Sequence, residues 1–289
     1  MSYDVTIVMP MYGHSDFADL AVRSMIRHSV STPSLCIVVE PVNTASDEEW
    51  LRDVLRVWPW KLRVLRNEKR LGYYASVNRG VRQCETQYAI VFTTDQVAAP
   101  QWDQRLLEHM ARRRFVTGRL IESGANLIAD GNIWRNFGFT PHQFDEHAFV
   151  RYCGSVRVKK VLDVPRHYIP MAFHVEDFVQ AGLFIEGRDS DKVSTYREDF
   201  HFVLRCYDNG YEFVEVQQPL TYHFQSGSRK GRYRWGWINA LYPFGLKYIH
   251  RMLTGYVSLY DALNERGAQA RVSAVSPRLN RQRINAEQA

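Results

Sequence analysis

The segment Tyr88–Asp95 (YAIVFTTD) is the most informative part of the sequence for the fold. It is a short apolar run that ends at a single carboxylate, Asp95. Such a run is typical of a buried strand. In open α/β sheets, ligands bind beyond the carboxyl ends of the strands, so an acidic side chain there can meet a cation that carries a substrate diphosphate. Asp95 is therefore the first candidate metal ligand. The alternative is that Asp95 caps a helix beginning near Pro100.

The chain before this segment alternates between strand and helix patterns. We expect strands at 5–9, 35–40 and 63–66 and a helix over 72–83. Ser15 is expected to cap one helix, and the spacing of Ser46 and Glu49 predicts a capping box for another, which Trp58-Pro59-Trp60 would end. This alternation predicts an α/β fold with a mostly parallel central sheet flanked by helices.

The second half of the chain carries weaker patterns. A helix is expected over 102–114, and the region from Gly118 to Pro170 gives no order of elements. Patterns return as a strand at 172–175, a helix over 198–208 and a strand over 211–216. A helical, aromatic and basic stretch over 235–263 predicts a C-terminal helical extension, and the polar tail after Gly267 is expected to be flexible.

Composition excludes several classes of protein. Hydrophobic residues make up 45% of the 289 residues, and no apolar run is long enough to cross a bilayer, which argues against an integral membrane protein. The first strand starts too early to leave room for a signal peptide, so a cytoplasmic location is expected. The four cysteines lie far apart with no paired spacing, which disfavours a zinc site and a disulfide framework and predicts reduced packing residues.

The net charge of +6 favours an anionic partner, which leaves a nucleotide diphosphate, a nucleic acid and an acidic membrane face open. Basic residues concentrate at Arg112–Arg114 and at 229–234. Runs of this kind are usually solvated surface. The second run follows a His/Ser/Gly loop, a position that suits a phosphate contact.

Several short motifs occur in an order that resembles family 2 glycosyltransferases of the GT-A fold, over residues 4–230. They are VTIVMPMYG at 5–13, VVE at 38–40, Asn67, Gly72, Asn78, Gly80, the Asp95 segment, GLF at 182–184, Glu198-Asp199 and His223. The resemblance implies a nucleotide-diphospho-sugar transferase fold and an inverting transfer of a hexosyl or deoxyhexosyl group to an acceptor hydroxyl. It also implies a domain over 1–232, with a nucleotide-sugar half at 1–117 and an acceptor and catalytic half at 118–232, followed by the extension at 233–267 and the tail at 268–289.

By the same resemblance, the nucleoside and phosphates would be held by residues at the ends of the first strands. These donor-side candidates are Pro10, Met11, Tyr12, Glu40, Asn67, Arg70 and Thr94. Relatives carry a pair of acidic residues where this chain has Glu40-Pro41. Taken alone, Pro10 and Tyr12 could be a simple turn after a strand. Arg229, Lys230 and Arg232 could form a lid over the diphosphate, because guanidinium and ammonium groups suit a departing dianion; a solvated loop is the alternative.

The resemblance assigns a divalent metal, Mn²⁺ or Mg²⁺, to Asp95 and His223. Family members carry Asp-x-Asp or Asn-Asn-Asp at the strand end, whereas this chain has Thr93-Thr94-Asp95, so one carboxylate remains. An imidazole ligand favours Mn²⁺ modestly. On its own, a histidine after a strand is more often a packed or surface residue.

Sugar transfer also needs a group that removes the acceptor proton. The resemblance makes Asp199 the general base and places Glu198 and His201 on the acceptor side, although His201 stands where many relatives have another acid. The alternative is that Glu198 and Asp199 only complement a helix dipole.

The leading hypothesis is a metal-dependent, inverting glycosyltransferase of polysaccharide or glycoconjugate synthesis. One alternative is a transferase acting on modified DNA bases, and another is a non-catalytic nucleic-acid or glycan-binding protein. The aromatic residues of 235–248 leave a peripheral membrane contact open if the acceptor is lipid-linked, although packing onto the domain is the commoner role.

Overall fold

The computed structural model describes residues 3–41, 44–124, 132–158, 161–163, 169–186, 202–203 and 205–225. The predicted C-terminal extension and tail lie outside these ranges, as do residues 198–201 and 204 of the predicted helix over 198–208, whereas residues 202–203 and 205–208 are described and are helical. The expected domain boundaries at 232 and 267 also lie outside them.

The first part of the chain is a set of parallel strands joined by helices. Its elements are β1 (Val5–Met11), α1 (Ser15–His28), β2 (Ser34–Val39), α2 (Ala45–Val57), β3 (Leu62–Arg66), α3 (Tyr73–Val81) and β4 (Tyr88–Val91). β1 pairs in parallel with β2 and β4, and β2 pairs in parallel with β3. The strands are apolar on both sides because helices cover both faces of the sheet.

The second part adds shorter elements and mixes the strand directions. They are β5 (Gln96–Ala98), α4 (Trp102–Leu107), β6 (Arg114–Glu122), β7 (Ile133–Trp134), η1 (Pro141–Gln143), α5 (Glu146–Ser155), β8 (Val161–Asp163), β9 (Met171–His174), α6 (Val175–Gln180) and β10 (Glu212–His223). The sheet order is β3-β2-β1-β4-β9-β6-β10-β5, with β7 on β6 and β8 on β10. The sheet flanked by helices is confirmed. β6 and β10 run parallel to each other, whereas β5, β8 and β9 pair antiparallel.

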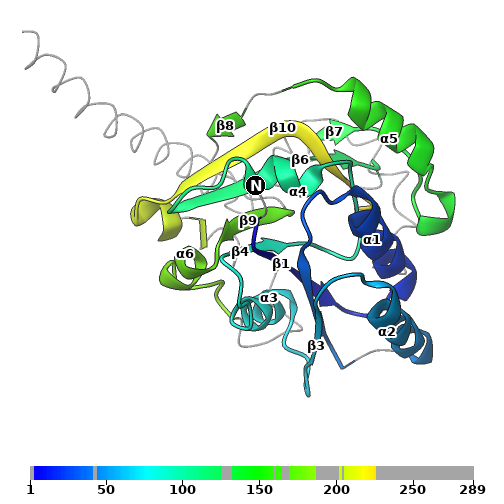
Figure 1. Ribbon diagram of the computed structural model, residues 1–289, viewed down its shortest axis with the longest axis horizontal. Coiled ribbons are helices and arrows are strands. Elements are labelled where there is room, and N and C mark those ends of the chain that lie inside the picture. The colour runs from blue at the N-terminus through cyan, green and yellow to red at the C-terminus, as the bar shows by residue number, and fades with distance from the viewer. Residues whose placement is uncertain are drawn as a thin grey trace, which may run out of the picture.

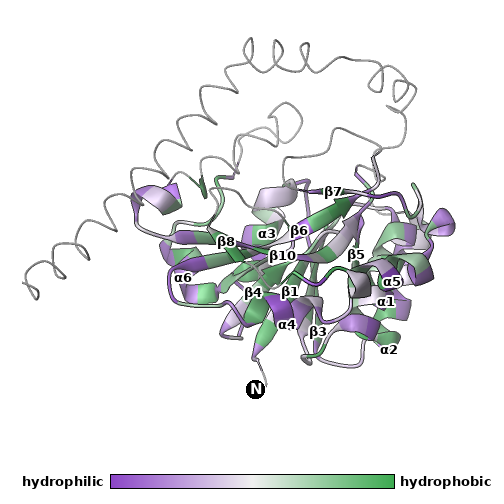
Figure 2. Ribbon diagram, turned by 90° about the horizontal axis from the view of Figure 1, so that it is seen from above, coloured by the Kyte–Doolittle hydropathy of each residue, from purple (hydrophilic) through white to green (hydrophobic). Residues whose placement is uncertain are grey.

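Two layers of helices bury the two faces of the sheet. Alternate residues of β1, such as Ile7 and Met9, pack with α1, α2 and α4, whereas Val8 packs with α3 and α6. Figure 1 shows α1 and α2 side by side at the right of the view, whereas α3 and α6 lie further to the left. In Figure 2 the hydrophobic colour gathers along the strands at the centre. A third cluster, which includes Phe149 of α5 and Tyr222 of β10, covers the far end of the sheet.

Three helix boundaries differ from the sequence prediction. Thr44, not Ser46, caps α2, and its capping-box partner is Asp47, not Glu49. The Asp47 carboxylate also accepts the Ser15 N–H at 2.9 Å, so Ser15 is not the cap of α1; His14, in the left-handed conformation, precedes that helix. The expected helix over 102–114 ends at Leu107, and the chain is already in β6 at Arg114. Phe115 and Val116, which directly follow the expected helix, pack in the core as strand residues.

The strand that leads toward Asp95 ends earlier than its apolar run. The ladder of β4 stops at Val91, and Asp95 lies in the turn before β5, where its carbonyl accepts the Phe224 N–H at 3.1 Å. α4 begins after Gln101, which has no side-chain capping bond. Asp95 is therefore not a helix cap, and that alternative is wrong.

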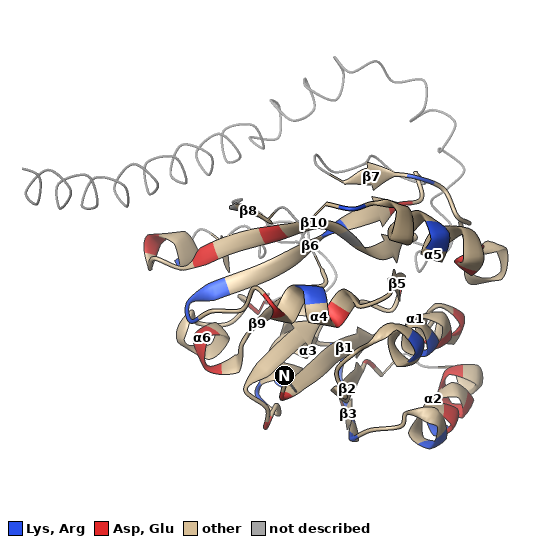
Figure 3. Cartoon of the chain, turned by 45° about the horizontal axis from the view of Figure 1, so that its top comes forward, with Lys and Arg blue, Asp and Glu red and all other residues tan. Residues whose placement is uncertain are grey.

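All four cysteines are free thiols, as predicted, and Cys36, Cys153 and Cys206 are buried. Charged residues lie on the helices and also along β6 and β10, whereas β1, β2, β4 and β9 carry none (Figure 3). Over the described residues, no helix is both long and apolar enough to cross a membrane.

Candidate active site at the carboxyl edge of the sheet

The parallel strands β1, β2, β3, β4, β6 and β10 all end at one side of the sheet, which we call the carboxyl edge. Predicted site residues follow directly after three of these strands: Tyr12 after β1, Glu40 after β2 and Asn67 after β3. His223 is the last residue of β10. The topology thus gathers residues as far apart in the sequence as Tyr12 and His223, in the place where α/β sheets bind ligands.

Glu40 organises the loop between β3 and α3. Its side chain is only 4% exposed, and its carboxylate accepts hydrogen bonds from the Leu71 N–H at 3.0 Å, the Gly72 N–H at 3.1 Å and the Ser76 hydroxyl at 2.6 Å. The Asn67 amide also donates to it, at 3.1 Å. These bonds give Glu40 a supporting role for the loop. A direct contact with a nucleoside stays a prediction.

Tyr12 and Arg70 join two loops of the carboxyl edge. The Arg70 guanidinium carbon lies 4.7 Å from the centroid of the Tyr12 ring, and 44% of Tyr12 is exposed. A half-exposed ring beside a cation suits both a base and a phosphate. The neighbouring Pro10 and Met11 are buried in β1, and the Met11 carbonyl accepts the Glu40 N–H at 3.0 Å. Their predicted donor contacts remain predictions.

Asp95 and His223 face each other. His223 Nε2 lies 3.5 Å from Asp95 Oδ2, and His223 Nδ1 lies 3.6 Å from Glu122 Oε1. Burial alone would lower the pKa of His223, but the carboxylates of Asp95 and Glu122 raise it to about 10. Burial alone would raise the pKa of Asp95, but the charge and hydrogen bond of His223 hold it below its ordinary value. The imidazole is thus held between two carboxylates.

The Asp95–His223 pair fits a divalent ion. Two ligands that bind one ion at about 2.1–2.2 Å lie roughly 3.0–3.5 Å apart, which matches the separation of Oδ2 and Nε2. One oxygen and one imidazole nitrogen suit Mn²⁺ better than Mg²⁺. Within the described part of the chain, no three or more His, Cys, Asp or Glu side chains form a metal site. Sites with one or two protein ligands are typical where substrate phosphates complete the coordination.

The other predicted site residues are placed less fully. Thr94 lies half-buried in the turn beside Asp95. Glu198, Asp199, His201, Arg229 and Lys230 lie outside the described residues, so their roles as acceptor-side groups, general base and lid stay predictions.

Sequence reasoning missed several residues of the carboxyl edge. Ser76 and Arg79 of α3 hold the Glu40–Asn67 cluster, with the Arg79 guanidinium donating to the Arg66 carbonyl at 2.7 Å. Trp134 of β7 is opposite Glu122 in the register, is 72% exposed, and has its indole against Gly124. A two-residue strand has no periodicity to detect. Glu122 is an acidic residue at the carboxyl end of β6, just as Asp95 is an acidic residue beyond the carboxyl end of β4. This shared position at a strand end is the sequence signal that could have indicated Glu122.

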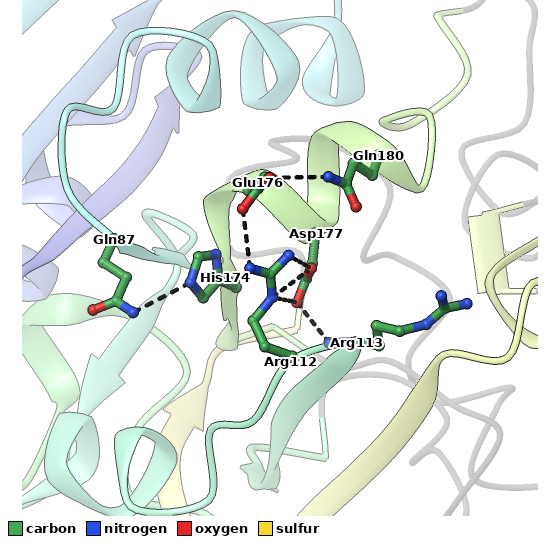
Figure 4. A network of polar contacts seen from close by, with 7 residues as sticks. All are labelled: Gln87, Arg112, Arg113, His174, Glu176, Asp177 and Gln180. Carbon is green, nitrogen blue, oxygen red and sulfur yellow. Dashed lines mark hydrogen bonds and ion pairs between the residues drawn. The ribbon is translucent and has the colours of Figure 1, made fainter.

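The first basic run is paired with carboxylates and lies away from the carboxyl edge, at the start of β6. Figure 4 shows the Arg112 guanidinium against Asp177 and Glu176 of α6, with Nη2 2.7 Å from Asp177 Oδ1 and Nη1 3.0 Å from Glu176 Oε2. The Arg113 N–H donates to Asp177 at 2.6 Å. Arg114 forms an ion pair with Glu212 of β10 at 2.7 Å. These three residues connect elements of the fold.

Comparisons with known proteins agree with this geometry. The chain is 22% identical over 218 residues to the uncharacterized glycosyltransferase MJ1057 of Methanocaldococcus jannaschii, covering 75% of this chain and 69% of the relative. A crystal structure of GalNAc-T7 with UDP, GalNAc and Mn²⁺ matches with a TM-score of 0.58 and 16% identity, over 77% of this chain and 44% of that one.

A second similar structure is that of S. aureus TarS 1–349 in complex with UDP-GlcNAc, with a TM-score of 0.54 and 12% identity, over 80% of this chain and 60% of that one. The chain therefore spans about half of these structural relatives, and the likeness establishes the GT-A fold. The sequence model of Glycosyl transferase family 2 matches residues 6–157, more than half of the chain. The chain belongs to glycosyl transferase family 2.

Proposed function

We propose that this protein is an inverting glycosyltransferase that uses a nucleotide-diphospho-sugar donor and a divalent metal ion. The observation that carries the proposal is the pair of metal-compatible atoms, Asp95 Oδ2 and His223 Nε2, 3.5 Å apart at the carboxyl edge. Family membership and the GT-A fold supply the reaction class.

The donor side is supported by the residues that follow β1, β2 and β3. Tyr12 and Arg70 offer an aromatic face and a guanidinium, and Glu40 fixes the loop that carries Arg70. Two structures with the same fold were determined with UDP and Mn²⁺ or with UDP-GlcNAc. We infer a uridine nucleotide as the first donor to test.

The chemistry divides between the two halves of the site. A divalent ion held by Asp95 and His223 would neutralise the diphosphate and stabilise it as a leaving group. Arg70, and the lid residues Arg229 and Lys230, would add positive charge on the same side. The acceptor hydroxyl attacks the anomeric carbon from the face opposite the diphosphate, and Asp199 accepts its proton. The carbon–oxygen bond to the diphosphate breaks as the new glycosidic bond forms.

A glycan or glycoconjugate is the acceptor class that the described residues favour. The exposed indole of Trp134, next to Glu122 in the register, offers an apolar platform of the kind that lines ligand sites. A DNA acceptor would need unpaired basic residues around the site. Arg112 and Arg114 are ion-paired and lie away from the carboxyl edge, so this run does not support that alternative.

A thermal-shift screen tests the donor and the metal together. UDP, GDP, dTDP and CMP would each be added with and without Mn²⁺ to the wild type and to Asp95→Ala and His223→Ala. A ligand at 100 times its Kd stabilises the folded state by about 2.7 kcal/mol, so a selective shift is measurable. We expect a shift with UDP that depends on Mn²⁺ and is lost in both variants. A shift that is independent of metal and variant would contradict the proposed site.

The general base is tested separately by Asp199→Asn. Loss of transfer with an unchanged Mn²⁺-dependent thermal shift is expected, because the base acts on the acceptor and not on the donor. Unchanged turnover would remove Asp199 from the mechanism.

A further inference from the structure

Glu122 is the last residue of β6, and the proposed function gives it no role. Its carboxylate lies beside Nδ1 of His223, the ring nitrogen that faces away from Asp95. Its side chain is 6% exposed, and its Oε1 is 3.6 Å from His223 Nδ1. Glu122 and His223 are register partners in the parallel β6–β10 pair. Strand pairing therefore places the Glu122 carboxylate next to Nδ1 of His223.

The backbone around Glu122 is held on both sides. On the β10 side, the Ser123 N–H donates to the His223 carbonyl at 3.2 Å, and the Gly124 N–H donates to Gln225 Oε1 at 2.9 Å. On the β7 side, the Arg135 N–H donates to the Glu122 carbonyl at 3.2 Å. These bonds hold the backbone that carries the Glu122 and His223 side chains.

The two nitrogens of His223 have different surroundings. Nε2 points to Asp95, whereas Nδ1 is buried and makes no hydrogen bond to the described residues. At 3.6 Å from Nδ1, Glu122 Oε1 is slightly beyond hydrogen-bond distance. A shift of a few tenths of an ångström in either side chain would bring it within reach. In metal sites, a carboxylate that accepts the second N–H of a histidine fixes the tautomer and the ring orientation.

We propose that Glu122 is a positioning residue that accepts the His223 Nδ1–H and so presents the Nε2 lone pair to the divalent ion beside Asp95. This inference rests on the proposed function, because it requires the ion to bind Asp95 and His223. The alternative is that Glu122 only stabilises the fold as a buried partner of a histidine.

Binding of Mn²⁺ to the full-length protein, followed by the EPR signal of the free ion, separates the two. The titration uses the nucleoside diphosphate that stabilises the wild type most in the screen above, UDP, GDP or dTDP. Loss of such a partner typically weakens metal binding 10–100-fold. We expect that loss in Glu122→Ala and a smaller one in Glu122→Gln, whose amide oxygen can still accept the Nδ1–H.

Glu215→Gln is the matched control. Glu215 is a buried glutamate like Glu122, but it lies in β10, toward the opposite end of that strand from His223. It should bind Mn²⁺ as the wild type does. The temperature of unfolding is recorded for every variant, and Glu122→Gln keeps the test usable if Glu122→Ala does not fold. NMR of ¹⁵N-labelled histidine with Mg²⁺ and the nucleotide checks the proposed ligand atom, because coordination removes the proton from Nε2 of His223 and leaves the proton on Nδ1.

Two outcomes would overturn the inference and are distinguishable. Wild-type Mn²⁺ affinity in both Glu122 variants, with affinity lost in His223→Ala, would reduce Glu122 to a structural residue while the proposed metal site stands. Wild-type affinity in His223→Ala and Asp95→Ala would remove the metal site itself, and the positioning role with it.

Discussion

At the scale of single residues, Glu40 shows that a predicted ligand residue can also have a structural role. An acidic residue after the second strand is expected to hold the nucleoside, and that contact stays a prediction. The Glu40 carboxylate accepts hydrogen bonds from two backbone N–H groups of the β3–α3 loop and from the side chains of Asn67 and Ser76. The sequence indicated the position, but the number of internal donors depends on how the loop returns, which no local pattern encodes.

Glu40→Ala should therefore destabilise the protein and disrupt the donor side. Removal of the carboxylate takes the acceptor from the half-buried N–H groups of Leu71 and Gly72 and from the buried Ser76 hydroxyl, and we expect a loss of about 3 kcal/mol in the free energy of unfolding. Urea denaturation measures this loss. Glu49→Ala, on the exposed side of α2, should stay within about 0.5 kcal/mol. A similar, small effect for both variants would contradict the role assigned to Glu40.

At the scale of elements, the N-terminal strands and helices could be predicted from the sequence because their apolar periods are long and their ends are marked. β1, α1, β2, α2, β3 and α3 all lie close to their predicted ranges. The elements between Gly118 and Pro170 could not be ordered, since β7 and β8 have two and three residues and their pairing partners are distant in sequence. Asp95 and His223 were predicted because they match motifs of the family that the sequence resembles. Glu122 was not predicted, because only the pairing of β6 with β10 brings it next to His223.

The packing of α3 on the sheet depends on Gly80. A Cβ at this position would lie 2.4 Å from Val8 Cγ1 and 3.0 Å from Val38 Cγ2. Gly80→Ala should cost about 1–3 kcal/mol through overpacking. Gly154 of α5 is the control, because a Cβ there meets no atom within 4 Å, and Gly154→Ala should raise stability by about 0.4–1 kcal/mol. Thermal unfolding of the two variants would contradict this account if their shifts had the same sign.

The connection between α6 and the start of β6 depends on Asp177 (Figure 4). Its side chain is 1% exposed, whereas its partner Arg112 is 55% exposed, so solvent weakens the ion pair and the bond from the Arg113 N–H at 2.6 Å gains weight. We expect Asp177→Ala to cost about 2 kcal/mol, because it removes the buried carboxylate that accepts the Arg113 N–H and the Arg112 guanidinium. Glu176→Ala, at an exposed ion pair, should cost at most about 0.5 kcal/mol. Equal losses in chemical denaturation would argue against this role of Asp177.

At the scale of the whole molecule, the four thiols report on the integrity of the core. Burial raises the pKa of Cys36 to about 11 and those of Cys84, Cys153 and Cys206 to about 12, from 9.0. The folded state favours the neutral thiols, so their contribution to stability is full below pH 9 and is lost as the pH rises from 9 toward 11–12. Iodoacetamide at pH 8 should modify the unfolded chain much faster than the native one. Rapid native labelling, or a urea midpoint that rises between pH 8 and pH 10, would contradict this burial.

The central claim is that the carboxyl edge brings one carboxylate and one imidazole together to hold a metal ion against a nucleotide-sugar diphosphate. The most direct measurement is the release of nucleoside diphosphate from a sugar donor, beginning with UDP-GlcNAc and UDP-GalNAc, by metal-stripped protein to which Mn²⁺ is added back. We expect release that requires the metal and falls at least about 100-fold in Asp95→Asn, the scale of one lost electrostatic contact to developing charge. Release that persists without metal and is unchanged in Asp95→Asn would contradict it.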